Sequence, residues 1–311
     1  MTGKAIFIDC PPFLGQLYSA ELRAILPDLV MTIGDPPGGD TVGLLAGAVG
    51  AINDHTLMNE ETLRACAGLK VIVFMGTGAL SYIDVEAAER IGIRVRTIRD
   101  YGNRTVAEHA VALMFAAARR IAAMDGAIRG GVWETLDAME LEHKTLGIVG
   151  TGSIGREMVR LGDGLGMKVL AWNRSGVAVD IRAEECALDD LMRRSDVVSL
   201  HLSLNDETEG MIDAGRIALM RPHAILVNTA RGGIIDEAAL IEALRQAKIS
   251  HAGLDVFAEE PLPPGHPLLT MGNVTLTSHA GFMTREASAR LLQMALEIMR
   301  DELAQMDAAR G

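Results

Sequence analysis

The sequence predicts an α/β protein of two doubly wound domains, each a parallel sheet covered by helices. Two observations support this fold class. Short apolar segments alternate with helix-length segments along the whole chain, and 311 residues with 49% hydrophobic content can bury two cores. Continuous apolar strands are typical of parallel sheets because helices cover both of their faces. Chains of this length commonly divide into two domains.

The expected strands are short apolar runs, and they fall into two groups along the chain. The first group precedes residue 100 and comprises residues 4–10, 29–33, 48–53, 71–75 and 93–98. The second group comprises residues 145–150, 168–172, 197–202, 224–228, 249–256 and 274–277. We therefore expect two separate parallel sheets.

A polar stretch at residues 99–103, RDYGN, marks the predicted boundary between the two groups of strands. A helix is expected directly after it, because Thr105 with Glu108 three residues later matches a capping box. The apolar stripe of that helix consists of Ala110, Leu113, Met114 and Ala117. This pattern predicts an amphipathic helix that opens the second domain.

The chain is expected to cross back near residues 281–286, where the last strand ends and a final long helix begins. Because the first sheet lacks enough helix cover of its own, we expect that helix to return to it. One predicted domain is thus residues 1–99 plus 284–311, and the other is residues 100–283. The sequence ends at residue 311, so no appended regulatory domain is expected.

Charge and composition exclude several classes of function. A net charge of −12, without a Lys/Arg-rich run, makes nucleic acid an unfavourable partner. The N-terminal apolar run is too short for a signal peptide, and the longest uncharged apolar run, residues 110–118, is under half a membrane span. Cys10, Cys66 and Cys186 are scattered, which suits buried thiols in a reducing cytoplasm rather than a metal or redox site. We expect a cytoplasmic protein without metal that acts on small molecules.

Residues 150–155 form a glycine-rich turn between a predicted strand and a predicted helix. The turn consists of Gly150, Thr151, Gly152, Ser153, Ile154 and Gly155. Gly150 permits a tight turn, Gly152 lets a pyrophosphate approach the backbone, and Gly155 lets helix and strand pack closely. The helix N–H groups then face the phosphates. In this context the motif favours a dinucleotide site over a packing turn.

The residues after the second strand of this domain bear on which coenzyme is bound. Dinucleotide sites for NAD carry an acid there, but this chain has Asn173, Arg174 and Ser175. An acid would repel a 2′-phosphate, whereas an arginine attracts it. The predicted cofactor is therefore NADP(H) or NAD(H), with NADP(H) favoured. The alternative is that Arg174 is only an exposed loop residue.

Chemically useful side chains follow three later strands of the same domain. Arg231 lies beyond residues 224–228, at the sheet edge where open α/β sheets bind ligands, and a guanidinium there can hold a carboxylate bidentately. Asp255 and Glu260 follow the next strand, and His279 follows the last one. By position alone, Arg231 could instead cap a turn, and the two acids could be exposed to solvent. His201 also follows a strand, so it is an alternative to His279 as the functional histidine.

The order of these pieces closely resembles the D-isomer-specific 2-hydroxyacid dehydrogenase family, which includes phosphoglycerate and D-lactate dehydrogenases. The resemblance includes NTARGGIIDEAAL, DVFAEEPL and TSHAG, continues through residues 101–113 and 196–213, and covers most of the chain from about residue 68. It implies Rossmann-like or flavodoxin-like domains with an active-site cleft between them. It also implies a homodimer packed through the cofactor domains, and a small anionic 2-oxo or 2-hydroxy acid as substrate.

The resemblance also implies residue roles. Arg231 would anchor the substrate carboxylate, Glu260 would pair with His279, and His279 would donate or accept the proton. Asp255 would contact the nicotinamide carboxamide. A protonated imidazole is a suitable acid near neutral pH, and a neighbouring carboxylate stabilises it.

The residues Gly76, Thr77 and Gly78 look like the family's substrate loop, whose backbone N–H groups help to hold the carboxylate. The loop is one residue longer than the common form, which leaves the identity of the substrate open. Two other functions remain possible at this point. A relative could oxidise formate or phosphite with the same Arg and His, and a corepressor-like protein could use the fold to sense a dinucleotide.

Overall fold

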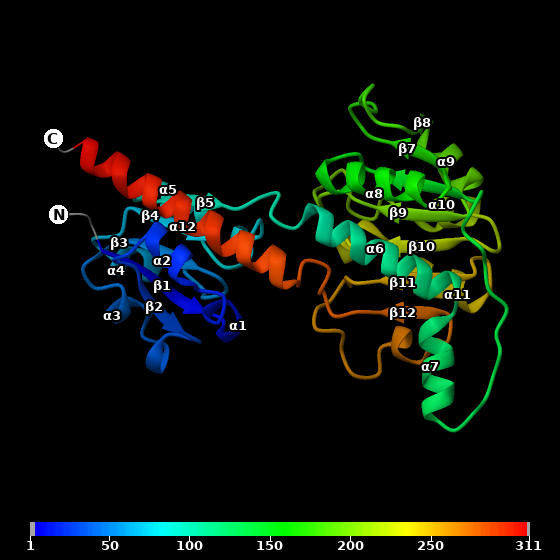
Figure 1. Cartoon of the computed structure of the whole chain (residues 1–311), viewed down its shortest axis with the longest axis horizontal. Helices are drawn as coiled ribbons and strands as arrows, with labels where there is room; N and C mark the ends of the chain where they lie inside the picture. Colours follow the sequence, from blue (N-terminus) through cyan, green and yellow to red (C-terminus); the bar gives the residue numbers. More distant parts are fainter. Residues whose placement is uncertain (1–3, 310–311) are drawn as a thin grey trace. The chain divides into compact units, whose positions relative to one another are not determined.

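The computed structural model describes residues 4–309, which form two compact units (Figure 1). Unit 1 joins the chain up to Gly102 with the chain from Met283 onward, and unit 2 is Asn103–Phe282. Residues 1–3 and 310–311, the ends of the predicted substrate-binding domain, lie outside the described part of the chain. Each unit has its own parallel sheet and its own core.

The sheet of unit 1 has the strand order β2-β1-β3-β4-β5, and every pairing in it is parallel. Its strands are β1 (Lys4–Cys10), β2 (Val30–Ile33), β3 (Ala48–Asn53), β4 (Val71–Phe74) and β5 (Arg94–Thr97). Its short helices are α1 (Pro12–Gly15), α2 (Ala20–Ile25), α3 (Thr41–Leu44), α4 (Glu60–Ala65) and α5 (Val85–Arg90). The predicted strands of this group are confirmed to within a residue or two at their ends.

Helix α12 (Arg285–Ala308) returns to the sheet of unit 1, as the sequence predicted. Its buried side chains, among them Leu292 and Met299, share one hydrophobic core with Phe7 of β1. Glu302 on the same helix is 4% exposed and is held by two arginines of β5. Burial raises the pKa of Glu302, but the hydrogen bonds from these arginines outweigh it and lower that pKa. The helix is thereby fastened to the sheet by both apolar and charged contacts.

The sheet of unit 2 has the order β12-β11-β10-β9-β6-β7-β8, again with every pairing parallel. Its strands are β6 (Thr145–Val149), β7 (Lys168–Trp172), β8 (Glu184–Glu185), β9 (Val197–Leu200), β10 (Ile225–Asn228), β11 (His251–Leu254) and β12 (Val274–Leu276). The chain runs outward from β6 to β8 and then returns to the other side of β6. The carboxyl end of β6 is therefore the switch point at which such sheets bind ligands.

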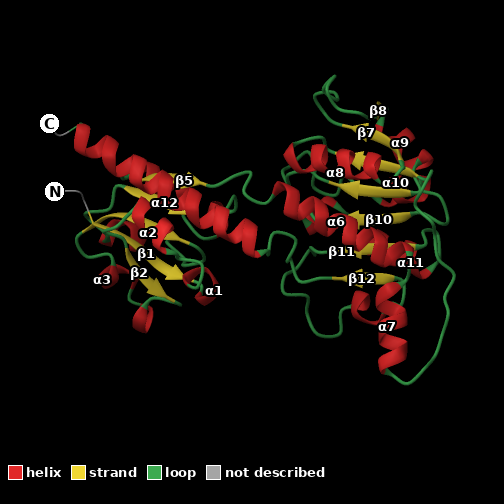
Figure 2. Cartoon of the chain, in the orientation of Figure 1, coloured by secondary structure: helices red, strands yellow, loops and turns green. Residues whose placement is uncertain are grey.

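Helices cover the sheet of unit 2, which confirms the doubly wound fold class (Figure 2). They are α6 (Asn103–Ala118), α7 (Ile121–Arg129), α8 (Ser153–Gly164), α9 (Leu188–Arg194), α10 (Ala214–Leu219) and α11 (Glu237–Arg245). The predicted stripe of α6 is buried in one core with Ile148 and Val227 of the sheet. Within residues 4–309 no helix is both long and apolar enough to cross a membrane.

The predicted capping box at the start of α6 is wrong. The helix begins at Asn103, so Thr105 lies inside its first turn and is buried rather than capping it. Glu108 accepts a hydrogen bond from Arg104 Nε at 2.5 Å instead of reaching back to the backbone. An arginine and a glutamate four residues apart lie side by side on a helix. Because Glu108 pairs with Arg104, its carboxylate is not available for a capping box.

Candidate active site

The glycine-rich turn that opens α8 fits a dinucleotide. A Cβ atom at Gly150 would lie 2.4 Å from the carbonyl oxygen of His201, and one at Gly155 would lie 2.0 Å from that of Gly150. A Cβ atom at Gly152, in contrast, would meet nothing within 4 Å. Among the residues that the structure describes, no side chain caps α8 at Gly152, so the first N–H groups of this helix are left for a ligand such as phosphate. The two crowded glycines thus shape the turn, and the open one leaves space in which a pyrophosphate group would fit.

Asn173 ties the end of β7 to this glycine-rich turn. Its Oδ1 accepts a hydrogen bond from the Thr151 N–H at 3.3 Å, and its Nδ2 donates to Ser175 Oγ at 2.9 Å. Nδ2 also donates to the carbonyl oxygen of Gly176 at 3.2 Å. The segment expected to face the adenosine ribose is therefore a turn fixed by its own side chain, and Arg174 projects from it into solvent.

Arg174 forms an ion pair with Glu207, which the sequence did not single out. Glu207 lies in the loop that follows β9, and both side chains are largely exposed. Only the strand order could have indicated Glu207, because β9 and β7 lie on either side of β6 and the loops after them end at the same edge of the sheet.

Arg231 lies in the loop after β10, and two contacts fix the backbone of that loop. Asn228 Nδ2 donates to the Arg231 carbonyl oxygen at 2.9 Å, and Asn228 Oδ1 accepts from the Ala230 N–H at 3.0 Å. A Cβ atom at Gly232 would lie 1.9 Å from the carbonyl carbon of Phe257. Only glycine allows this approach, so the loop of Arg231 packs backbone to backbone on the loop after β11.

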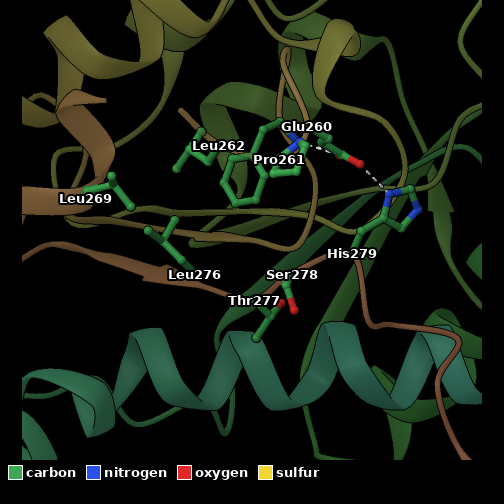
Figure 3. A pocket seen from close by; sticks show the side chains of 9 residues that line it. Glu260, Pro261, Leu262, Leu269, Leu276, Thr277, Ser278 and His279 are labelled. Carbon is green, nitrogen blue, oxygen red and sulfur yellow. Dashed lines mark hydrogen bonds and ion pairs between the residues drawn. The ribbon is translucent and has the colours of Figure 1, made fainter. Parts of the chain in front are cut away.

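Glu260 and His279 are brought together at the same edge of the sheet. His279 Nδ1 lies 2.6 Å from Glu260 Oε2, and the Phe257 N–H donates to Glu260 Oε1 at 2.9 Å (Figure 3). Both side chains are partly exposed. With a carboxylate at Nδ1, the imidazole holds a proton there, and Nε2 is the atom left to exchange a proton with a ligand. Phe282 stands edge-on to this imidazole, with the ring centroids 6.4 Å apart.

The backbone at His279 is left-handed, with φ +52°, a conformation that non-glycine residues adopt rarely. Asp255 holds it: its carbonyl oxygen accepts the His279 N–H at 2.8 Å, and its carboxylate accepts the N–H groups of Ala280 and Gly281 at 2.9 Å each. Rare backbone conformations persist where the surroundings fix them, as they do here. Asp255 therefore positions the histidine.

Asp255 is 1% exposed and remains a carboxylate. Burial alone would raise its pKa, but hydrogen bonds from His109, Thr277 and the two backbone N–H groups lower the pKa to about 2. A charged acceptor strengthens each of these bonds. Its contact with a nicotinamide carboxamide stays a prediction.

An apolar cavity of about 600 Å³ adjoins the Glu260–His279 pair. Its lining residues are Phe257, Glu260, Pro261, Leu262, Leu269, Leu276, Thr277, Ser278 and His279 (Figure 3). The leucines lie on the side of the cavity away from the imidazole.

His201, the competing strand-end histidine, lies in a different environment. Its Nε2 is 2.9 Å from Ser199 Oγ, and burial lowers its pKa to about 4. It is therefore neutral near pH 7 and has no proton to give. Among residues 4–309, no group of three or more His, Cys, Asp or Glu side chains is placed to hold a metal ion.

The predicted substrate loop lies in unit 1, directly after β4. Gly76 has φ +142°, and its carbonyl oxygen accepts the Ile98 N–H at 2.8 Å. Within residues 4–309, no protein acceptor takes the backbone N–H groups of Thr77 and Gly78. Two free donors in sequence suit an anion such as a carboxylate.

Comparison with known proteins matches residues 111–281 to the family model described as "D-isomer specific 2-hydroxyacid dehydrogenase, NAD binding domain". The chain is 40% identical over 310 residues to a glyoxylate reductase of Aeropyrum pernix, an alignment that covers 94% of this chain and 89% of the relative. It is 39% identical over 241 residues to a D-3-phosphoglycerate dehydrogenase of Archaeoglobus fulgidus, covering 76% of this chain and 46% of that protein. The chain thus spans less than half of the latter relative's length.

Among solved structures, the chain is similar to an acyclic imino acid reductase determined in complex with NADPH and D-Arg. The TM-score is 0.83 with 30% sequence identity, and the match covers 97% of both chains.

Proposed function

Because the chain belongs to the D-isomer specific 2-hydroxyacid dehydrogenase family and is a nicotinamide-dependent oxidoreductase, we propose that it reduces a small 2-oxo acid, with His279 as proton donor. The observation that carries the proposal is the 2.6 Å contact between His279 Nδ1 and Glu260 Oε2. It leaves Nε2 as the one imidazole nitrogen not engaged by the carboxylate. The cofactor, when bound, supplies the hydride.

Each residue of the proposed site then has a defined role in the reaction. Reduction places negative charge on the carbonyl oxygen, and His279 Nε2 gives it a proton. Glu260 stabilises the imidazolium that this step requires. Arg231 holds the substrate carboxylate bidentately and polarises the carbonyl. Gly76, Thr77 and Gly78 are proposed to offer backbone N–H donors to a carboxylate.

The proposed function is tested by the oxidation of NADPH and NADH with a panel of 2-oxo acids. Glyoxylate, hydroxypyruvate, pyruvate and phenylpyruvate differ in size and polarity at the same reacting group. Because its relative from Aeropyrum pernix is a glyoxylate reductase, we expect turnover with glyoxylate. Absence of turnover with all four acids, with coenzyme bound, would contradict the proposal.

Glu260→Gln is expected to lower kcat for 2-oxo acid reduction by about tenfold or more. The variant replaces the carboxylate that lies 2.6 Å from His279 Nδ1 with a neutral amide, so the imidazole that gives the proton loses its charged partner. Steady-state kinetics with an accepted 2-oxo acid measure the loss. Glu259→Gln removes the same charge from the neighbouring, exposed position and should leave kcat unchanged. An unchanged kcat in the Glu260→Gln variant would contradict the pairing.

The coenzyme is proposed to be NADP(H), with NAD(H) also accepted. No acid at the end of β7 repels a 2′-phosphate, and the exposed guanidinium of Arg174 can pair with one. Arg174→Ala should lower kcat/KM for NADPH by about tenfold, since a charge-assisted hydrogen bond is lost, and leave that for NADH nearly unchanged. Arg182→Ala, at another exposed arginine, is the matched control. Equal losses with both coenzymes would make Arg174 an ordinary loop residue.

A homodimer is also proposed, and α7 is the surface that we assign to it. This nine-residue helix buries none of its own residues in the chain. Ile121, Ile128, Val132 and Trp133 are more than half exposed on it and just after it. Apolar side chains gathered in this way are typical of subunit contacts. Light scattering of the chain in solution measures the mass, and a monomer at all concentrations would contradict the assignment.

A further inference from the structure

The Arg174–Glu207 ion pair spans the switch point of the sheet in unit 2. Arg174 follows β7 and Glu207 lies in the loop after β9, while β6 lies between these two strands. A contact between the two loops therefore passes over the carboxyl end of β6. The glycine-rich turn begins at that end, with Gly150 directly after the strand.

Internal hydrogen bonds fix both loops that carry the pair. Asn205 Oδ1 accepts the N–H groups of Glu207 at 3.0 Å and Thr208 at 3.2 Å. Thr208 Oγ1 donates to the Ser203 carbonyl oxygen at 2.7 Å. On the other side, Asn173 holds the turn of Arg174 against the glycine-rich turn. The two charged side chains are thus presented from fixed backbones, while their ends are exposed and able to exchange partners.

We propose that Glu207 sets coenzyme preference by competing with the 2′-phosphate of NADPH for Arg174. The inference rests on the coenzyme part of the proposed function. The acid that is missing after β7 is supplied here from the loop after β9, where it neutralises the guanidinium. NADPH must replace Glu207 as the partner of Arg174, whereas NADH leaves the ion pair in place. Glu207 therefore weakens NADPH binding selectively.

The expected effect of Glu207 on the Kd of NADPH is small because both side chains of the ion pair are exposed. Arg174 is 73% and Glu207 is 64% exposed, so solvent screens their attraction and the competition is modest. Glu207→Gln keeps the shape of the side chain and removes its charge. We expect the Kd of NADPH to fall by about fivefold and that of NADH to change by less than about twofold. In an Arg174→Ala background, Glu207→Gln should change the Kd of NADPH by less than about twofold, because no partner is left to compete for.

The test is a titration of the full chain with NADPH and NADH, followed by fluorescence transfer from protein to nicotinamide. It needs no substrate, so its outcome is independent of whether the chain reduces a 2-oxo acid. Glu209→Gln removes the same charge two residues along the loop, where the side chain is also exposed, and should leave both affinities unchanged.

Three outcomes would overturn the inference. One is an unchanged Kd of NADPH in the Glu207→Gln variant. Another is an equal change in the Kd of NADPH and of NADH. A third is that Glu207→Gln lowers the Kd of NADPH just as much in the Arg174→Ala background. Failure of every 2-oxo acid in the panel, with the NADPH shift present, would contradict only the proposed reaction.

Discussion

Replacing His279 with asparagine is expected to lower kcat for 2-oxo acid reduction by about 10²-fold or more, while NADPH still binds. Asparagine tolerates the left-handed backbone at this position, where φ is +52°, better than alanine does. Its amide can still donate to Glu260 Oε2, but it has no proton to give to a carbonyl oxygen at neutral pH. The expected loss is therefore chemical rather than structural.

The design separates proton donation from folding. His279→Ala should lose as much activity as His279→Asn, and it should also lose some stability because alanine is strained at positive φ. Thermal unfolding and the Kd of NADPH measure the structural part in both variants. His143→Asn changes an exposed histidine that also has positive φ and should leave turnover unaffected. Turnover close to that of the parent in the His279→Asn variant would exclude His279 as the donor.

The sheets could be predicted from the sequence because each buried parallel strand is a continuous apolar run. The run at residues 145–150 was recognisable for this reason, whereas the helix α8 was recognisable from the glycine-rich turn that precedes it. Strand β8 was not predicted, since it is two exposed glutamates with no apolar signal. Helix α7 was also missed, because none of its residues is buried by the rest of the chain.

The candidate site was predictable in part for a similar reason. Parallel strands end at one edge, so residues that follow strands in sequence come together in space, as Glu260 and His279 do. Contacts that depend on loop shape gave no such signal. The pairing of Arg174 with Glu207 joins loops that only the strand order relates. The carboxylate of Asp255 faces the turn of His279, which neither its spacing nor its residue type indicates.

Arg231→Lys is expected to lower kcat/KM for 2-oxo acids by roughly 10- to 1000-fold, although it keeps the positive charge. A lysine is a single-point donor and cannot hold a carboxylate with two parallel hydrogen bonds, so the substrate loses its orientation. Polarisation of the carbonyl weakens at the same time, which affects kcat as well as KM.

The contacts around Arg231 indicate that Arg231→Lys would lower activity without affecting the fold. Asn228 and Gly232 fix the loop through backbone contacts that a lysine side chain does not alter. The guanidinium is exposed and donates to the carbonyl oxygen of Ala230 at 2.6 Å, so little folding energy depends on it. Thermal unfolding and the Kd of NADPH should match the parent, and Arg245→Lys on α11 serves as the exposed control. If kcat/KM stays near that of the parent for every accepted 2-oxo acid, Arg231 only caps its turn, and the substrate carboxylate must be held elsewhere.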